Sequence, residues 1–167
     1  TGSCRASTRR VHYSRSLAAK IEAGKTMVNN APRWLTIAGI VSLLWNLMGV
    51  WSFVTNWQMS KTGYAGLPDV QRELWSAMPT WTWIAFAVAV GCGTAGAIAL
   101  LLRKRLAAPL FLISFIAIIV QFSWPIFMTD AFSKMGAELV TFPAILALAG
   151  ALQFYLARRW TARGWLM

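Results

Sequence analysis

The chain has 167 residues, of which 57% are hydrophobic and only 13% are charged. Because a soluble domain usually carries about 25% charged residues, this composition excludes an ordinary soluble protein and favours a chain that crosses a membrane several times. The formal net charge is +11, but the cations gather at the chain ends and in one short turn. Such clusters are typical of membrane topology determinants, so we expect lipid headgroups as their partners and no nucleic acid.

The N-terminal 30 residues form a basic segment without apolar periodicity. Its cations are Arg5, Arg9, Arg10, Arg15, Lys20 and Lys25. It contains no apolar stretch of the length that a secretory signal peptide requires. We expect residues 1–30 to be a disordered arm, or upstream sequence that the native protein lacks, in which case its true start is Met27.

Cysteine and histidine usage limits the chemistry of the chain. Cys4 and the only histidine, His12, lie in the N-terminal arm, whereas Cys92 lies in the middle of an apolar run. This separation predicts no disulfide. Because the apolar runs contain no histidine, we expect no zinc, haem or copper site and no cofactor.

The first apolar run, residues 34–55, is uncharged and long enough to cross the roughly 30 Å hydrocarbon core at about 1.5 Å per residue. Pro32 precedes it, and proline suits the first turn of a helix. We therefore predict the first membrane span here. The polar connection that follows contains the segment Pro68–Trp75, which predicts a short amphipathic helix on the membrane surface.

Three further apolar runs, uncharged apart from Glu138, predict three further spans, at about 80–102, 109–128 and 138–157. The cationic cluster Arg103-Lys104-Arg105 separates the second span from the third, as expected of a turn at a membrane face. Together with the first span, these runs make residues 31–160 one membrane domain. The predicted fold class is all-α, an integral-membrane four-helix bundle, and residues 161–167 form a basic and aromatic tail.

Lysine and arginine counts predict the orientation of the bundle. Seven lie in the chain up to Arg33, three in the central turn and three in the C-terminal tail, whereas the loops on the opposite side hold three. Since the positive side is cytoplasmic, we predict that both termini lie in the cytoplasm of a bacterium and that the spans cross its inner membrane. The cations expected to bind anionic headgroups are Arg103, Lys104, Arg105, Arg158 and Arg159.

The predicted spans contain no Asp, Glu, Lys, Arg or His apart from Glu138 at the mouth of the fourth. Cation-coupled transport and acid–base catalysis usually need such a group within the membrane. We therefore expect neither an enzyme nor a proton antiporter.

Neutral polar side chains remain as candidates for a site. Ser42 and Asn46 share a face of the first span, Ser114 and Gln121 share a face of the third, and Asn46 and Gln121 are expected at similar depth. Two interpretations are open: hydrogen bonds between helices worth about 0.6 kcal/mol each, which we favour, or a cavity for a neutral hydroxylated solute. The candidate residues are Ser42, Asn46, Thr94, Ser114, Gln121, Ser123 and Trp124.

Small residues recur at a spacing of four in the second span, where Gly91 pairs with Ala95 and Gly93 with Ala97. This spacing lets a neighbouring helix approach closely. It predicts a packing face, and a contact between copies of the chain could use the same four residues.

Three strings carry a resemblance to a known family: LLWNLMGVWSF at 43–53, MPTWTWIAFAVAVGCGTAG at 78–96, and LLLRKRLAAPLFLISF at 100–115. They are similar to a family of small four-span bacterial inner-membrane proteins, some of which are labelled sugar transporters. The similarity runs from Met27 to the C-terminus, and the N-terminal arm departs from the pattern. The resemblance implies four spans and carries no binding or catalytic residue onto this chain.

We therefore expect a multi-pass inner-membrane protein with a structural or accessory role. The alternative is a small neutral-solute, sugar-type transporter that acts as an oligomer.

Overall fold

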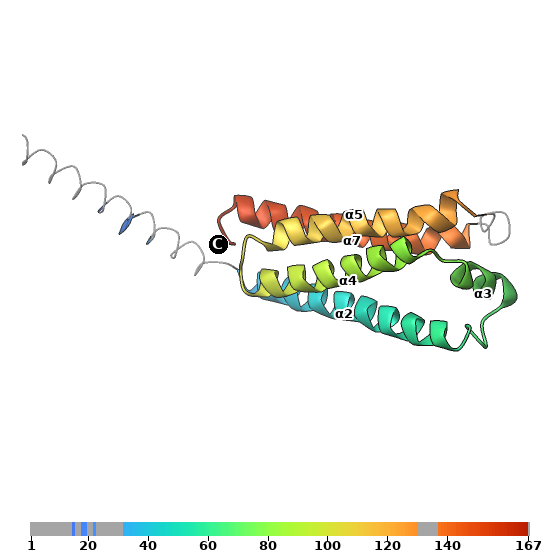
Figure 1. Cartoon of the computed structure of the whole chain (residues 1–167). Coiled ribbons are helices and arrows are strands. Elements are labelled where there is room, and N and C mark those ends of the chain that lie inside the picture. Colours follow the sequence, from blue (N-terminus) through green and yellow to red (C-terminus); the bar gives the residue numbers. More distant parts are fainter. Residues whose placement is uncertain (1–14, 16–17, 20–21, 23–31, 130–136, 167) are drawn as a thin grey trace, which may run out of the picture.

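The computed structural model describes residues 15, 18–19, 22, 32–129 and 137–166 (Figure 1). Apart from four residues, the N-terminal arm lies outside the described part of the chain. The described residues form five helices: α2 (Arg33–Lys61), α3 (Asp69–Ser76), α4 (Thr80–Leu101), α5 (Ala107–Phe127) and α7 (Glu138–Ala162). All except α3 are long and apolar enough to cross a membrane. This confirms the all-α class, and each of the four predicted spans overlaps one of these long apolar helices.

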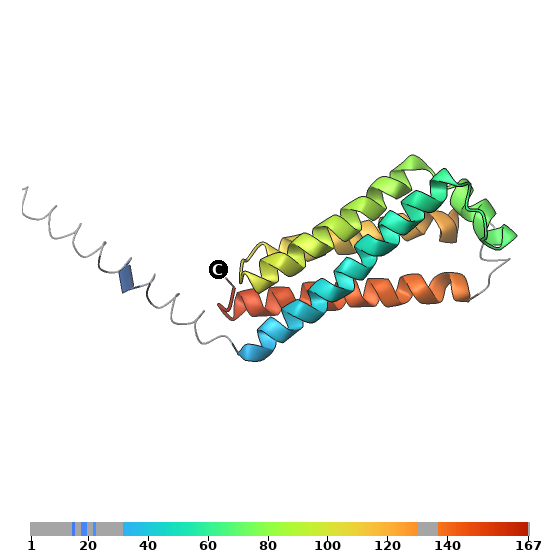
Figure 2. The same cartoon turned by 90° about the horizontal axis from the view of Figure 1, so that it is seen from below.

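The four long helices pack in chain order, with α2 against α4, α4 against α5, and α5 against α7 (Figure 1). We call the end that holds the turn between α4 and α5 the inner end, and the opposite end the outer end. The first and last helices, α2 and α7, approach each other toward the inner end and diverge toward the outer end (Figure 2). The bundle is therefore a row of antiparallel neighbours whose two edge helices meet along only part of their length.

The contact between α4 and α5 is the most extensive in the bundle, because α4 presents small residues to larger ones. Ala85, Ala89, Gly93 and Ala97 are buried at a spacing of four along α4. A Cβ placed on Gly96 would lie 3.0 Å from the ring of Phe111, so the aromatic side chain of α5 rests directly on the α4 backbone. Such small residues let two helix axes come close together.

Helix α2 is longer than the predicted first span, since it continues to Lys61 and contains 29 residues. At 1.5 Å per residue it is about 43 Å long, well beyond the roughly 30 Å of a hydrocarbon core. It runs obliquely to its neighbours (Figure 2). The short helix predicted at Pro68–Trp75 is present as α3.

Helices α2, α4 and α7 end in one shared motif, in which a left-handed residue follows the helix and the next backbone N–H returns to a carbonyl of the last turn. The left-handed residues are Gly63, Arg103 and Gly164, with φ of 63°, 55° and 74°. Glycine adopts this conformation freely, but a residue with a Cβ is strained there by about 1 kcal/mol. The turn after α4 therefore holds strain at Arg103, while its Lys104 N–H bonds the Ala99 carbonyl at 2.8 Å.

The apolar core lies at the inner end. Leu35, Leu100, Phe111, Trp160 and Leu166 are all 3% exposed or less, and together they draw side chains from each long helix and from the C-terminal tail. Helix α7 ends at Ala162, and the left-handed Gly164 turns the chain back so that Leu166 enters the core. The last described residues of the predicted tail are therefore part of the folded domain.

Candidate functional site

Asn46 of α2 is 9% exposed and makes the central polar contact of the bundle. Its Nδ2 donates to the carbonyl of Ser42, one turn earlier, at 2.7 Å and to Oε1 of Gln153 on α7 at 3.3 Å. Its Oδ1 fills the space that a Cβ on Gly93 of α4 would need. The side chain of Asn46 on α2 therefore contacts both α4 and α7.

Ser114 of α5 reaches the same place from the other side. Its Oγ donates to the Ala89 carbonyl of α4 at 2.6 Å, and a Cβ on Gly93 would lie 3.0 Å from that Oγ. Asn46 and Ser114 therefore converge on the bare backbone of Gly93. We call the residues Asn46, Gly93, Ser114 and Gln153, one from each long helix, the polar junction.

The chemistry of the polar junction follows from its apolar surroundings. An amide or hydroxyl that is buried without a partner costs about 1–3 kcal/mol, so each such group must find a hydrogen bond on a neighbouring helix or in its own helix. Gly93 allows this because it has no side chain to hold α2 and α5 away. The bonds themselves contribute only about 0.6 kcal/mol each in a membrane, so the junction acts mainly by favouring one arrangement of the helices.

In the described part of the chain, three of the seven predicted site residues, Ser42, Thr94 and Ser123, make hydrogen bonds only within their own helices. Thr94 Oγ1 donates to the Val90 carbonyl at 2.8 Å, and Ser123 Oγ donates to the Val120 carbonyl at 2.6 Å. Ser42 contributes its carbonyl to Asn46, while its own hydroxyl, though buried, has no hydrogen-bond partner among the described residues. Neither Thr94 nor Ser123 thus donates a hydrogen bond to a residue of the polar junction.

Gln121 and Trp124 are buried on α5, at 6% and 8% exposure. Gln121 lies two helical turns beyond Ser114, about 10 Å toward the outer end. Because Asn46 and Ser114 both flank Gly93, Asn46 is level with Ser114 and not, as the counts along each span predict, with Gln121. No hydrogen bond joins the Gln121 side chain to another described residue.

Gln153 is the polar-junction residue that the sequence interpretation missed. It is the one amide of the fourth predicted span, and it lies about as far from the inner end of α7 as Gly93 lies from the inner end of α4. This similarity of depth is the only feature of the sequence from which Gln153 could have been predicted as a partner of Asn46.

The four small residues of α4 divide into two pairs. Gly93 and Ala97 are buried within one chain, where they pack against α2 and α5. Gly91 and Ala95 are exposed, and a Cβ on Gly91 would meet no atom within 4 Å. Within this group, only Gly91 and Ala95 are free to contact a second copy.

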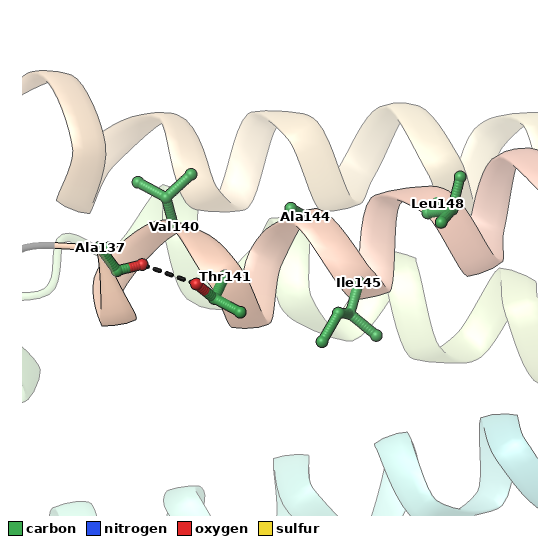
Figure 3. Close-up of a pocket in the computed structure, with 6 residues that line it drawn as sticks. All are labelled: Ala137, Val140, Thr141, Ala144, Ile145 and Leu148. Carbon is green, nitrogen blue, oxygen red and sulfur yellow. Dashed lines mark hydrogen bonds between the residues drawn. The ribbon is translucent and has the colours of Figure 1, made fainter.

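A pocket of about 580 Å³ lies away from the polar junction, on the outer half of α7 (Figure 3). Its lining residues are Ala137, Val140, Thr141, Ala144, Ile145 and Leu148. The single hydroxyl among them, on Thr141, donates to the Ala137 carbonyl of its own helix at 2.8 Å. The pocket therefore has an apolar surface with no polar group directed at a ligand.

Aromatic rings fill the outer end between α2, α3 and α4. Trp83 is central, with its ring centroid 5.6 Å from that of Trp57 on α2 and 6.1 Å from that of Trp75 on α3. Tyr64, in the connection between α2 and α3, is 4% exposed, and its ring centroid lies 6.1 Å from that of Trp75 with the two rings tilted. Burial raises the pKa of the Tyr64 phenol above its usual value, against an opposing hydrogen bond with Ser60. These rings fix the short helix α3 against the bundle.

No group of three or more His, Cys, Asp or Glu side chains gathers as a metal site anywhere in the described ranges. Comparisons of the chain with protein-family models, with curated proteins and with solved structures found no match.

Proposed function

We propose that this chain is a multi-pass protein of a bacterial inner membrane, with both termini in the cytoplasm, and that its role is structural or accessory rather than enzymatic. Four helices of membrane-spanning length and composition support the membrane location. The cations of the central turn and of the end of α7 lie at the inner end, which supports a cytoplasmic position for that end.

One observation carries the structural role: polar side chains in the interior of the bundle bind other helices of the same chain. Asn46 of α2 donates to Gln153 of α7, and Ser114 of α5 donates to the Ala89 carbonyl of α4. A solute site would instead direct such donors into a cavity. Here they hold the edge helices α2 and α7 and the central pair α4 and α5 in one arrangement.

Uptake into vesicles tests this role. The full chain is reconstituted into vesicles of phosphatidylethanolamine and phosphatidylglycerol, and the entry of radiolabelled sugars and polyols is followed. We expect entry no faster than into protein-free vesicles. Saturable uptake that disappears in the double variant Asn46→Leu, Gln121→Leu, while that variant keeps its helical circular dichroism, would overturn the structural role.

Labelling of single cysteines tests the orientation. In a chain with Cys4 and Cys92 replaced by serine, Lys104→Cys is expected to react with a membrane-impermeant maleimide only after the cells are opened. Lys61→Cys, near the end of α2, is expected to react in intact spheroplasts. The reverse pattern contradicts the proposed topology.

A second candidate function, transport of a neutral hydroxylated solute by an oligomer, is favoured by Gln121. Its side chain is buried and makes no hydrogen bond to a described residue. Pro125, four residues later, has no N–H to bond the Gln121 carbonyl. If this function is correct, Gln121→Leu alone should abolish uptake without loosening the bundle, and the exposed face of Gly91 and Ala95 would be the contact between copies.

A further inference from the structure

Three tryptophans from the two ends of the described chain meet at the inner end of the bundle. The ring centroid of Trp34, in the first turn of α2, lies 5.2 Å from that of Trp160 and 5.8 Å from that of Trp165 in the tail, with both contacts edge-to-face. The next residue, Leu166, is fully buried. The tail is therefore a docked segment with a defined backbone position.

Two arginines contact this docked tail, and a third, Arg33, adjoins a tryptophan that packs on it. Arg105, from the central turn, donates through Nε to the Leu166 carbonyl at 3.3 Å. The guanidinium carbon of Arg163 lies 5.2 Å from the ring centroid of Trp165. Arg33 directly precedes Trp34, whose ring touches Trp165. Three cations that are far apart in the sequence thus lie around one group of rings, and each is exposed.

The positive charge at this end has no counterpart of opposite sign within residues 32–129 and 137–166. The acidic residues of the described chain are Glu22 in the N-terminal arm, Asp69 and Glu73 on α3, and Glu138 at the start of α7, of which the last three lie at the outer end. Further cations of the central turn and of α7, Lys104 and Arg158, add to the potential at the inner end. A site of this kind attracts phosphate.

We propose that Arg33, Arg105 and Arg163, held around the docked tail, bind the phosphodiester headgroup of an anionic phospholipid in the cytoplasmic leaflet. The inference rests on the membrane location and orientation proposed above. Because Nε of Arg105 donates to the Leu166 carbonyl, the plane of its guanidinium group is fixed. Its terminal N–H groups can then donate hydrogen bonds to phosphate oxygens. Trp34 and Trp165 lie where indoles suit the headgroup region of a bilayer.

A built site differs from a general attraction of cations to a charged surface in two ways. Binding at such a site depends on the planar, paired N–H donors of the Arg105 guanidinium, which lysine cannot reproduce. It also depends on the docked conformation of the tail. General attraction depends on neither, because it follows the number of positive charges.

Native mass spectrometry of the full chain in detergent tests the proposal, with phosphatidylglycerol titrated onto delipidated protein. We expect one tightly retained phosphatidylglycerol and no retained phosphatidylcholine. Arg105→Lys, which keeps the charge, and the double variant Arg105→Gln, Arg163→Gln should each weaken this binding at least about tenfold. The matched control is Arg72→Gln, which removes an exposed arginine paired with Asp69 at the outer end and should leave binding unchanged.

A second variant separates the tail from the charges. Gly164→Val strains the left-handed position at φ 74° and should undock the tail, so that lipid affinity falls although all three arginines remain. Full affinity in either Arg105→Lys or Gly164→Val overturns the proposal in favour of general charge attraction. Displacement of phosphatidylglycerol by inorganic phosphate at equal concentration overturns it in favour of a site for free anions.

The lipid-binding measurement and the cysteine-labelling measurement can refute their two hypotheses separately. Loss of selectivity for phosphatidylglycerol together with the expected cysteine labelling refutes only the lipid site. Retained selectivity together with reversed labelling refutes the proposed orientation, and with it the assignment to the cytoplasmic leaflet, but leaves the binding of the lipid by the arginines intact.

Discussion

Replacement of Gly93 by alanine is the sharpest test of the polar junction. The new Cβ would collide with Oδ1 of Asn46 and lie 3.1 Å from its Cγ and 3.0 Å from Oγ of Ser114. Ser114 is held by its 2.6 Å bond to the Ala89 carbonyl, so Asn46 is the group that must move. When it moves, its bond to Gln153 on α7 breaks.

The change in the free energy of unfolding caused by Gly93→Ala is the sum of three contributions. A methyl group forced into a filled interior costs about 1–3 kcal/mol, and the lost bond between α2 and α7 adds about 0.6 kcal/mol. Alanine regains up to about 1 kcal/mol through its higher helix propensity. The free energy of unfolding should therefore fall by about 1–2 kcal/mol.

Reversible unfolding in mixed detergent micelles, followed by circular dichroism, measures this difference. Gly91→Ala is the matched control, because the same substitution two residues away meets no atom within 4 Å. That control should be neutral or stabilising by up to about 1 kcal/mol. Addition of Asn46→Ala to Gly93→Ala removes the colliding amide, so the pair should be less destabilised than the two single losses combined. Equal stability of Gly93→Ala and Gly91→Ala would refute the close approach of Asn46 to α4.

Three further tests probe other parts of the structure by the same unfolding measurement. A double-mutant cycle of Asn46→Leu and Gln153→Leu should give a coupling energy of about 0.6 kcal/mol, and a coupling of zero would show that the two amides do not bond. Arg103→Gly should stabilise the chain by about 0.5 kcal/mol, because glycine relieves the left-handed strain; Lys104→Gly is the control and should not stabilise. Leu166→Ala should destabilise by about 2 kcal/mol, the lower part of the range for a buried leucine, since the end of the chain can partly close the cavity; no loss would mean that the tail does not dock.

The number and positions of the long helices could be predicted from the sequence, because an uncharged run of membrane-spanning length is an unambiguous signal. Helix ends were harder to place. Helix α2 continues past the predicted end of its span to Lys61, and polar residues there bond back into the helix, as Asn56 Nδ2 does to the Ser52 carbonyl at 2.8 Å. Hydrophobicity marks where hydrocarbon ends, whereas a helix ends where its capping motif lies, here at Gly63.

The polar junction could be predicted only in part. Periodicity places Ser42 and Asn46 on one face of α2, and both are buried. It does not say which helix lies opposite. Whether Asn46 meets Gln153 depends on the angle at which α2 crosses the bundle, because α2 and α7 touch along only part of their length. A crossing angle produces no periodic pattern in the sequence, so this contact could not be predicted. The docking of the tail could not be predicted for a related reason. It depends on only two residues, Gly164 and Leu166, which form no recognisable sequence pattern.

The partial contact between α2 and α7 has a consequence for the order in which the chain folds. Helices α4 and α5 are joined by a tight turn, so their pairing closes the shortest loop and is available first. Helices α2 and α7 can then join opposite sides of this hairpin independently of each other. The bond between Asn46 and Gln153 spans 107 positions of the chain and can form only when both have docked. Like the contact between Trp34 and Trp160 of the same two helices, it closes only after both edge helices have docked, so its formation marks completion of the fold.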